Sequence, residues 1–208
     1  MKIYGIELIE AHDMVIKHQR DTGKPFESES VKAWVDACEN GGTALDIGAY
    51  TGLYSLLAAK YGAQSVAFEP NKAVFERLML NIYANDLPVH AIHCAIGAKA
   101  GTCSLTTNKN TKLTSAGKVT GSHGDIDMYA VDDFAFSNVC AIKIDTEGFE
   151  CAVLIGASET IHKCKPVIIT EALTGQDYIE QKTLMSRFDY HGTRADERNI
   201  IWRPLFAS

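Results

Sequence analysis

The chain has 208 residues, of which 46% are hydrophobic and 22% are charged, with a formal net charge of −6. This composition excludes a disordered or fibrous chain, and the acidic balance argues against a broad nucleic-acid surface, which would need clustered lysine and arginine. We expect a cytoplasmic protein without disulfides, because no apolar run is long enough for a membrane span, the first residues do not resemble a secretory signal, and the six cysteines are scattered.

The predicted elements start with a lead-in, residues 1–42, that ends in a helix stopped by two glycines. Strands then alternate with helices, which is typical of a single α/β domain, 1–208, with a mostly parallel sheet and helices on both faces. Residues 98–124 are polar and predict a small hairpin with an exposed loop, and the tail beyond 189 predicts an antiparallel pair at one sheet edge. Strands are expected at 43–47, 65–69, 89–96, 139–145 and 166–171, and helices at 28–40, 51–61 (Thr51 as N-cap), 71–85 (Asn71 as N-cap), from about 149, and at 176–188.

The most informative motif is Ala-Leu-Asp-Ile-Gly-Ala-Tyr-Thr-Gly at 44–52, a buried strand followed by a glycine-rich turn into a helix. Glycines allow a tight turn, and the new helix presents unpaired N–H groups. Glu69 ends the next strand about 20 residues later, where an acid accepts hydrogen bonds from ribose hydroxyls. A dinucleotide fingerprint would need glycine where Tyr50 and Leu53 stand, which disfavours a nicotinamide dehydrogenase. The pattern Asp-x-Gly-x-x-x-Gly is typical of S-adenosylmethionine-binding methyltransferases.

A second cluster of charged residues ends the fourth expected strand. Lys143 and Asp145 should share one face of that strand, with Glu147 in the following turn. A lysine beside two carboxylates is typical of functional sites, although a structural ion pair would give the same pattern. A metal ion held by Asp145, Glu147 and Glu171 is an alternative, but the ligand spacing is not diagnostic and we expect no metal.

Taken together, these motifs resemble the FkbM-type methyltransferase family. The resemblance implies a class I methyltransferase (Rossmann-like) fold with a seven-stranded sheet, S-adenosyl-L-methionine as cofactor, and methylation of a hydroxyl oxygen on a small molecule or sugar. The chain departs from the family pattern at Tyr50, Thr146 and Phe149. The matching stretches are 21–27, 45–52, 67–71, 81–85, 95–97, 131–133, 142–150 and 153–157.

The motifs also predict residue roles. Asp145 or Glu147 is the expected general base, oriented by Lys143, with His123 as a second candidate. Residues 98–133 are expected to form a variable insertion beside the acceptor. Alternatives are a nucleic-acid or protein methyltransferase and a non-catalytic S-adenosylmethionine-binding protein. The cofactor is expected to contact Asp46, Gly48, Ala49 and Gly52 through its methionine part, Glu69 through its ribose hydroxyls, and Ala95 and Ile96 through its adenine. The other expected cofactor contacts are Tyr50, Pro70 and Asp145.

Overall fold

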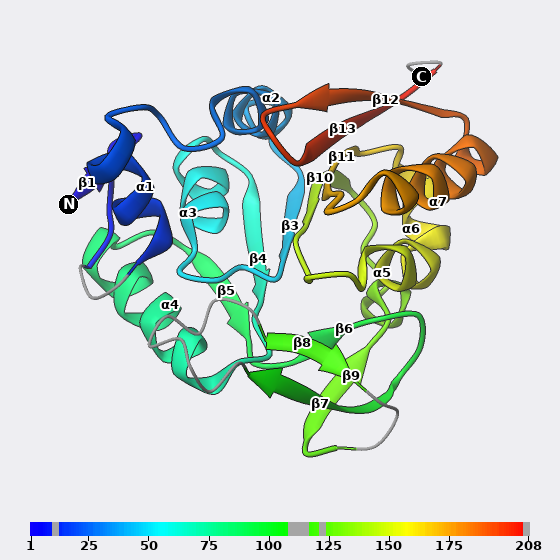
Figure 1. Cartoon of the computed structure of the whole chain (residues 1–208), viewed down its shortest axis with the longest axis horizontal. Helices are drawn as coiled ribbons and strands as arrows, with labels where there is room; N and C mark the ends of the chain where they lie inside the picture. The colour runs from blue at the N-terminus through cyan, green and yellow to red at the C-terminus, as the bar shows by residue number, and fades with distance from the viewer. Residues whose placement is uncertain (10–12, 108–116, 121–123, 206–208) are drawn as a thin grey trace.

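The structure, a computed structural model, describes residues 1–9, 13–107, 117–120 and 124–205, and its centre is a seven-stranded sheet (Figure 1). The strand order is β12-β13-β11-β10-β3-β4-β5. The neighbouring strands β5, β4, β3, β10 and β11 are parallel, and β13 and β12 add the antiparallel edge, as the sequence predicted. The strands are β3 (Thr43–Ile47), β4 (Gln64–Phe68), β5 (Val89–Ile92), β10 (Val139–Ile144), β11 (Val167–Glu171), β12 (Tyr190–Ala195) and β13 (Asn199–Pro204).

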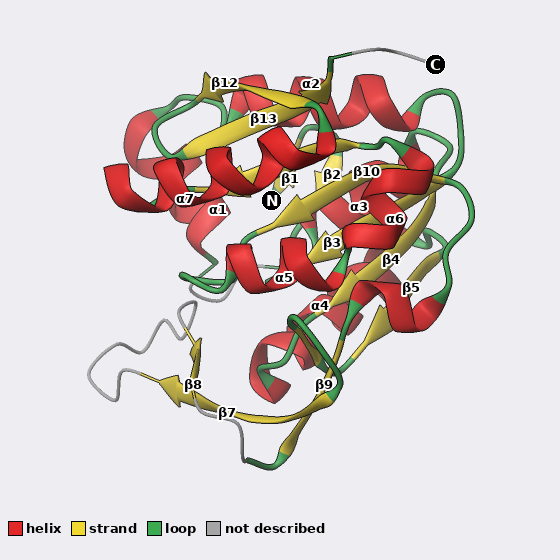
Figure 2. Cartoon of the chain, turned by 90° about the vertical axis from the view of Figure 1, so that its right-hand side faces the viewer, coloured by secondary structure: helices red, strands yellow, loops and turns green. Residues whose placement is uncertain are grey.

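Helices cover both faces of the sheet, so the central strands are apolar on both sides. One face carries α2 (Ser28–Cys38), α3 (Leu53–Lys60) and α4 (Lys72–Asn85). The other face, toward the viewer in Figure 2, carries α5, α6 and α7. Their bounds are Glu150–Gly156, Ser158–Cys164 and Gly175–Met185.

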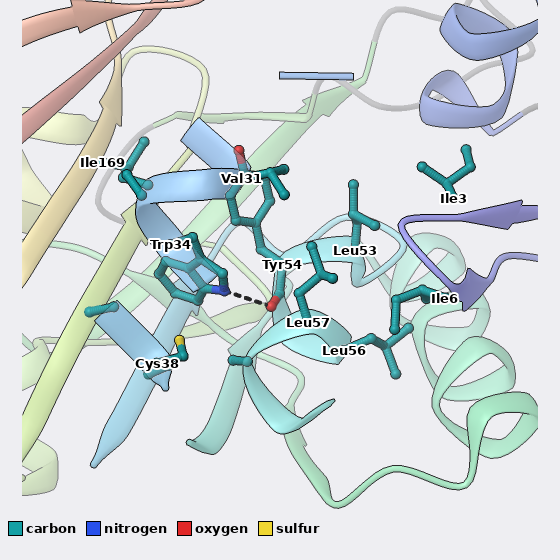
Figure 3. Close-up of a cluster of buried hydrophobic side chains, with 14 of the residues drawn as sticks. Ile3, Ile6, Val31, Trp34, Cys38, Leu53, Tyr54, Leu56, Leu57 and Ile169 are labelled. Carbon is teal, nitrogen blue, oxygen red and sulfur yellow. Dashed lines mark hydrogen bonds between the residues drawn. The ribbon is translucent and has the colours of Figure 1, made fainter. Parts of the chain in front are cut away.

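The core under α2 and α3 is built around an aromatic pair. Trp34 of α2 is fully buried, and its Nε1 donates to the carbonyl oxygen of Tyr54 at 2.9 Å (Figure 3). The two rings pack edge to face with centroids 5.5 Å apart. The second tryptophan, Trp202, lies in the core on the other face. Both tryptophans are therefore buried core residues.

The N-terminal residues pack against α3 and α4 rather than forming part of the sheet. They contain the short strands β1 (Lys2–Ile3) and β2 (Ile6–Glu7), then α1 (Met14–Thr22). Asp13 caps α1 through the N–H of Ile16 and also accepts a hydrogen bond from the Thr51 hydroxyl. The buried Asn81 links Ile9 N–H to the Thr51 carbonyl. These contacts fix residues 13–27, here called the N-terminal strap, against the ends of the strands.

A second sheet of four strands accounts for the main difference from the predicted strands. The strand expected at 89–96 is divided, because β5 ends at Ile92 and Ala95–Ile96 forms β6, which pairs with β9 in the second sheet. The predicted hairpin is β7 and β8, whereas β9 was not predicted. The bounds are β6 Ala95–Ile96, β7 Gly101–Thr107, β8 Gly117–Thr120 and β9 Ile126–Tyr129, near the bottom of Figure 1.

Several helix ends also differ from expectation. Helix α3 begins at Leu53 with Gly52 as N-cap, because the Thr51 hydroxyl is bonded to Asp13. Asn71 does cap α4, accepting from two backbone N–H groups. The chain expected to be helical from 149 divides at Ala157 into α5 and α6, and α7 ends at Met185 before a short 3-10 turn, Ser186–Phe188. In the described ranges, no helix combines the length and apolar character that crossing a membrane requires.

Candidate active site

A cavity opens at the carboxyl ends of β3, β4 and β10. The chain runs from β3 outward through β4 to β5, then returns to β10 on the other side of β3. Ligands of open α/β sheets bind at such a switch in strand order. The cavity contains about 1070 Å³ of space free of protein atoms, which includes the solvent at its open mouth. Of the predicted site residues, those lining it are Asp46, Gly48, Ala49, Tyr50, Glu69, Pro70, Ala95, Ile96, Lys143, Asp145 and Glu147.

The glycine-rich turn has a different physical role from the expected one. A Cβ atom on Gly48, where φ is +78°, would lie 1.9 Å from the carbonyl oxygen of Asp145. Gly52 is not among the residues that line the cavity, because its α-carbon faces Leu78 of α4, 2.4 Å from where a Cβ would sit. The glycines therefore let the turn approach protein backbone and side chains, rather than a ligand alone.

Glu69 closes the cavity at the end of β4. Its Oε2 accepts from Tyr50 N–H at 3.0 Å, and its Oε1 accepts from Asn71 N–H at 2.8 Å. Tyr50 adopts a left-handed backbone conformation, with φ +51°, that directs this N–H to the carboxylate. Burial raises the pKa of Glu69 to about 7, against the two backbone hydrogen bonds, which lower it. Glu69 thus joins the two loops that follow β3 and β4.

Asp46 lies within β3 rather than at its end, and it is 2% exposed. Its Oδ2 accepts a hydrogen bond from the Ser55 hydroxyl of α3. Burial raises the pKa of Asp46 to about 6, while the Ser55 hydrogen bond and the charge of Lys143 lower it. Asp46 and Lys143 are paired in register on neighbouring strands, so both side chains face α3.

Lys143 of β10 and Asp145, the residue that follows this strand, point to the same side, as predicted, and form an ion pair. Lys143 Nζ donates to Asp145 Oδ2 at 3.0 Å, and the lysine side chain is 2% exposed. Burial favours the neutral amine, but the charges of Asp145 and Glu27 outweigh it, so the pKa of Lys143 is raised and it stays protonated. Its ammonium also lies 5.3 Å from the ring centroid of Tyr54.

Glu147 stands in the turn after β10, with φ +55°. Burial raises its pKa, helped by the charges of Asp145 and Glu150. The turn itself is held by the buried Glu150, whose Oε1 accepts from Thr146 N–H, the Thr146 hydroxyl and Gly148 N–H at 3.0 to 3.1 Å. The sequence assigned Glu150 no role, and it does not form a capping box, because it is the first residue of α5 and accepts from residues that precede the helix.

Glu171 ends β11 beside the position of Asp145, but it does not line the cavity. Arg198 lies 3.6 Å from its carboxylate, and burial raises the pKa of Glu171 to about 7. No three His, Cys, Asp or Glu side chains within the described ranges are placed to hold a metal ion together. His123, the second candidate for the base, lies outside the described residues.

The side expected to contact adenine is apolar. Ala95 and Ile96 are each 2% exposed, and Cys94 and Leu105 line the cavity with them. Pro70 follows Glu69, and its carbonyl oxygen lies 3.0 Å from Nε2 of His93. Ala95 and Ile96 form β6 of the second sheet, so this wall of the cavity comes from the second sheet and not from the main one.

The N-terminal strap provides a further wall of the cavity, with residues to which the sequence assigned no individual role. Met14, Val15, Phe26 and Glu27 line the cavity, and the Glu27 carboxylate accepts from the Tyr54 hydroxyl at 2.7 Å. Glu27 has φ +46°, an uncommon conformation for a residue other than glycine. The hydrogen bond between Glu27 and Tyr54 joins residues that are 27 apart in the chain, and no local sequence pattern indicates it. The unusual backbone of Glu27 could be found only in the structure.

The strand order, the helices on both faces and the cavity at the switch point define a class I methyltransferase fold. The family model described as the methyltransferase FkbM domain matches residues 46–195, so this chain belongs to that family. The N-terminal strap lies outside the matched residues. No curated protein matches the chain in sequence.

Solved structures share this fold at low identity. The methyltransferase FkbM from Methylobacillus flagellatus KT aligns with a TM-score of 0.59 and 18% identity over 78% of this chain and 44% of its own, so this chain spans less than half of that protein. A precorrin-6Y C5,15-methyltransferase from Geobacter metallireducens GS-15 gives 0.54 and 11% over 84% and 86%. An rRNA methylase from Streptococcus thermophilus gives 0.56 and 8% over 86% and 95%. At these identities the likeness concerns the fold.

Proposed function

We propose that this protein is an S-adenosylmethionine-dependent methyltransferase that methylates a hydroxyl oxygen on a small molecule or sugar. One observation carries the proposal: a single cavity joins the Glu69 carboxylate at the end of β4 to Lys143, Asp145 and Glu147 at the end of β10. The first group suits an adenosine and the second suits proton transfer. Membership of a methyltransferase family supports the reaction type.

The residues present fit the cofactor. An ionised carboxylate has about four lone-pair sites, and Glu69 uses two of them on backbone N–H groups. Each oxygen therefore keeps one site for a ribose hydroxyl. Ala95 and Ile96 offer the apolar surface that a purine ring needs. The buried Asp46 and Lys143 supply opposite charges beside the turn at 48–52.

S-adenosylmethionine, when bound, supplies a methyl group on a sulfonium, which is already a good leaving group. The protein's part is to align the acceptor oxygen, a contribution that reaches ~7–11 kcal/mol in well-oriented systems. A placed base that takes the hydroxyl proton adds about 10²–10⁴-fold. Of the two candidates, Glu147 is favoured, because its pKa is raised and Asp145 is bonded to a protonated lysine. Lys143 orients Asp145 through this bond.

The charges of the cavity support a small neutral or cationic acceptor over a nucleic acid. Among the described residues, the Asp, Glu, Lys and Arg side chains that line it are one lysine and five acids, and such a surface repels phosphate groups. A protein methyltransferase and a non-catalytic cofactor-binding protein are the remaining alternatives. The five acids are Glu27, Asp46, Glu69, Asp145 and Glu147.

Calorimetry with S-adenosylhomocysteine tests the cofactor site. We expect Glu69→Gln to weaken binding roughly 10-fold, because removing a charge-assisted hydrogen bond costs about 1.5–3 kcal/mol. Glu76→Gln, on the exposed side of α4, is the matched control and should bind as the unmodified protein does. Equal affinities for both variants would reject the ribose role of Glu69. Methyl transfer from labelled S-adenosylmethionine to a panel of hydroxylated sugars then separates an enzyme from a non-catalytic binder.

A further inference from the structure

Lys143 is a buried ammonium with donors to spare. Within the described part of the chain, its Nζ makes one hydrogen bond, to Asp145 Oδ2. An ammonium has three N–H donors. Its side chain is 2% exposed, yet it lines the cavity. A buried cation that keeps free donors beside a cavity is suited to binding an anionic group there.

The surroundings hold this ammonium in place. The Tyr54 ring lies 5.3 Å from Nζ and covers one side of it. Trp34 Nε1 donates to the carbonyl oxygen of Tyr54, as Figure 3 shows, and the Tyr54 hydroxyl donates to Glu27 of the strap. Tyr54 and Glu27 thus prevent the ammonium from moving away from Asp145, and neither has a part in the proposed chemistry.

The charges around Lys143 match a zwitterion. The charges of Asp145, Glu27 and Asp46 all act on the ammonium, and all three carboxylates line the same cavity as Lys143. An anion alone would meet this negative surplus, and a cation alone would leave the free donors of Lys143 unused. A group that carries both an ammonium and a carboxylate satisfies both sides. The α-amino-acid end of a cofactor is such a group.

We propose, resting on the proposed function, that Lys143 binds the α-carboxylate at the amino-acid end of S-adenosylmethionine, while the neighbouring carboxylates accommodate its α-ammonium. Lys143 is then a cofactor-binding residue as well as a partner of Asp145. Tyr54 is a positioning residue that acts through it, whereas Glu27 both bonds to Tyr54 and supplies one of the neighbouring carboxylates. Recognition of the amino-acid end is thereby separate from recognition of the adenosine by Glu69.

Calorimetry with three ligands separates the binding of the amino-acid end of the cofactor from the binding of its adenosine. They are S-adenosylhomocysteine, its decarboxylated analogue, and methylthioadenosine, which lacks the amino-acid end altogether. The unmodified protein should bind S-adenosylhomocysteine roughly 10- to 100-fold more tightly than the decarboxylated analogue, as expected for one charge-assisted hydrogen bond. Lys143→Met should abolish this preference and bind methylthioadenosine as before. Lys165→Met is the matched control, because Lys165 also lies over a tyrosine ring but outside the cavity, and it should keep the preference.

The outcomes are distinguishable. If the analogue binds the unmodified protein as tightly as S-adenosylhomocysteine does, or if Lys143→Met keeps the preference, the inference is wrong while the cofactor site stands. If none of the three ligands binds, the proposed function fails and the inference with it. If Lys143→Met does not fold, a crystal structure of the unmodified protein with S-adenosylhomocysteine decides. A carboxylate hydrogen-bonded to Nζ supports the inference, and a carboxylate elsewhere overturns it.

Discussion

The two halves of the cavity are held in different ways. In the half at the ends of β3 and β4, backbone groups bond to one another: Gly48 and Ala49 N–H both reach the Phe68 carbonyl at 2.9 and 3.0 Å. In the half at the end of β10, side-chain charges do this work, through Lys143 with Asp145 and through Glu150 with its turn. The first half is thus fixed mainly by backbone contacts, to which Glu69 adds a carboxylate link between its two loops, and the second mainly by ionised groups.

This difference separates two kinds of sensitivity. A half held by backbone contacts tolerates changes in charge but little change in volume, since close packing leaves no room for added atoms. A half held by charges tolerates small changes in shape but depends on ionisation and on each carboxylate. The halves meet where Gly48 lies against Asp145, whose N–H also donates to Ile47 at 2.9 Å.

The largest effect is expected where the halves meet. Gly48→Ala should lower the free energy of unfolding by about 4 kcal/mol, because its Cβ would overlap the Asp145 carbonyl and φ is positive. Gly62→Ala is the matched control, since φ is +99° there and nothing lies within 4 Å. It should cost only the backbone strain of about 1–2 kcal/mol. Urea unfolding measures both, and equal losses would show that the halves are not in close contact.

The second largest effect is the pH dependence of stability that Glu69 causes. It tests whether the stability of the backbone-held half depends on an ionisable group. The pKa of Glu69 rises from 4.5 to about 7 on folding. The folded protein then binds more protons than the unfolded chain between these values. The contribution of Glu69 to the free energy of unfolding is therefore fully present below pH 4.5. It is lost as the pH rises through 7, and its size is about 3 kcal/mol.

Glu69→Gln should remove this part of the pH dependence. Unfolding free energies of both proteins between pH 4 and 8, from urea titrations, give the two slopes. A remaining slope in the same direction is expected from Asp46, whose pKa is also raised, to about 6. If the unfolding free energy depends on pH in the same way in both proteins, Glu69 has its ordinary pKa in the folded protein and this prediction is wrong.

The sequence predicted the parts of the site that follow local patterns. Apolar runs located the parallel strands, and the spacing from Gly48 to Glu69 brought both to one cavity. Alternation along β10 placed Lys143 and Asp145 on one face. These predictions succeed because strand period and strand-end position are properties of short segments.

Other parts depend on contacts between distant segments and could not be predicted. The strap reaches the cavity through Asp13 with Thr51, 38 residues apart, and neither residue type indicates a partner. Likewise, Ala95 continues an apolar run, but the chain turns after Ile92 and β6 pairs with β9 instead. The proximity of Gly48 to Asp145 could not be predicted either. A glycine-rich turn has the same composition whether its glycine lies against a ligand or against a backbone carbonyl.

The smallest effect concerns the charge-held half and isolates one carboxylate. Glu150→Gln keeps an oxygen that accepts from Thr146 and Gly148 but removes the charge, so the stability should fall by about 1 kcal/mol. Glu159→Gln is the control, because Glu159 also lies in the first turn of a helix but is exposed, and it should change stability by at most about 0.5 kcal/mol. Thermal unfolding of the two variants compares them. If both lose the same amount, the helix dipole accounts for the effect of Glu150, and the turn that carries Glu147 is held by its backbone, like the other half of the cavity.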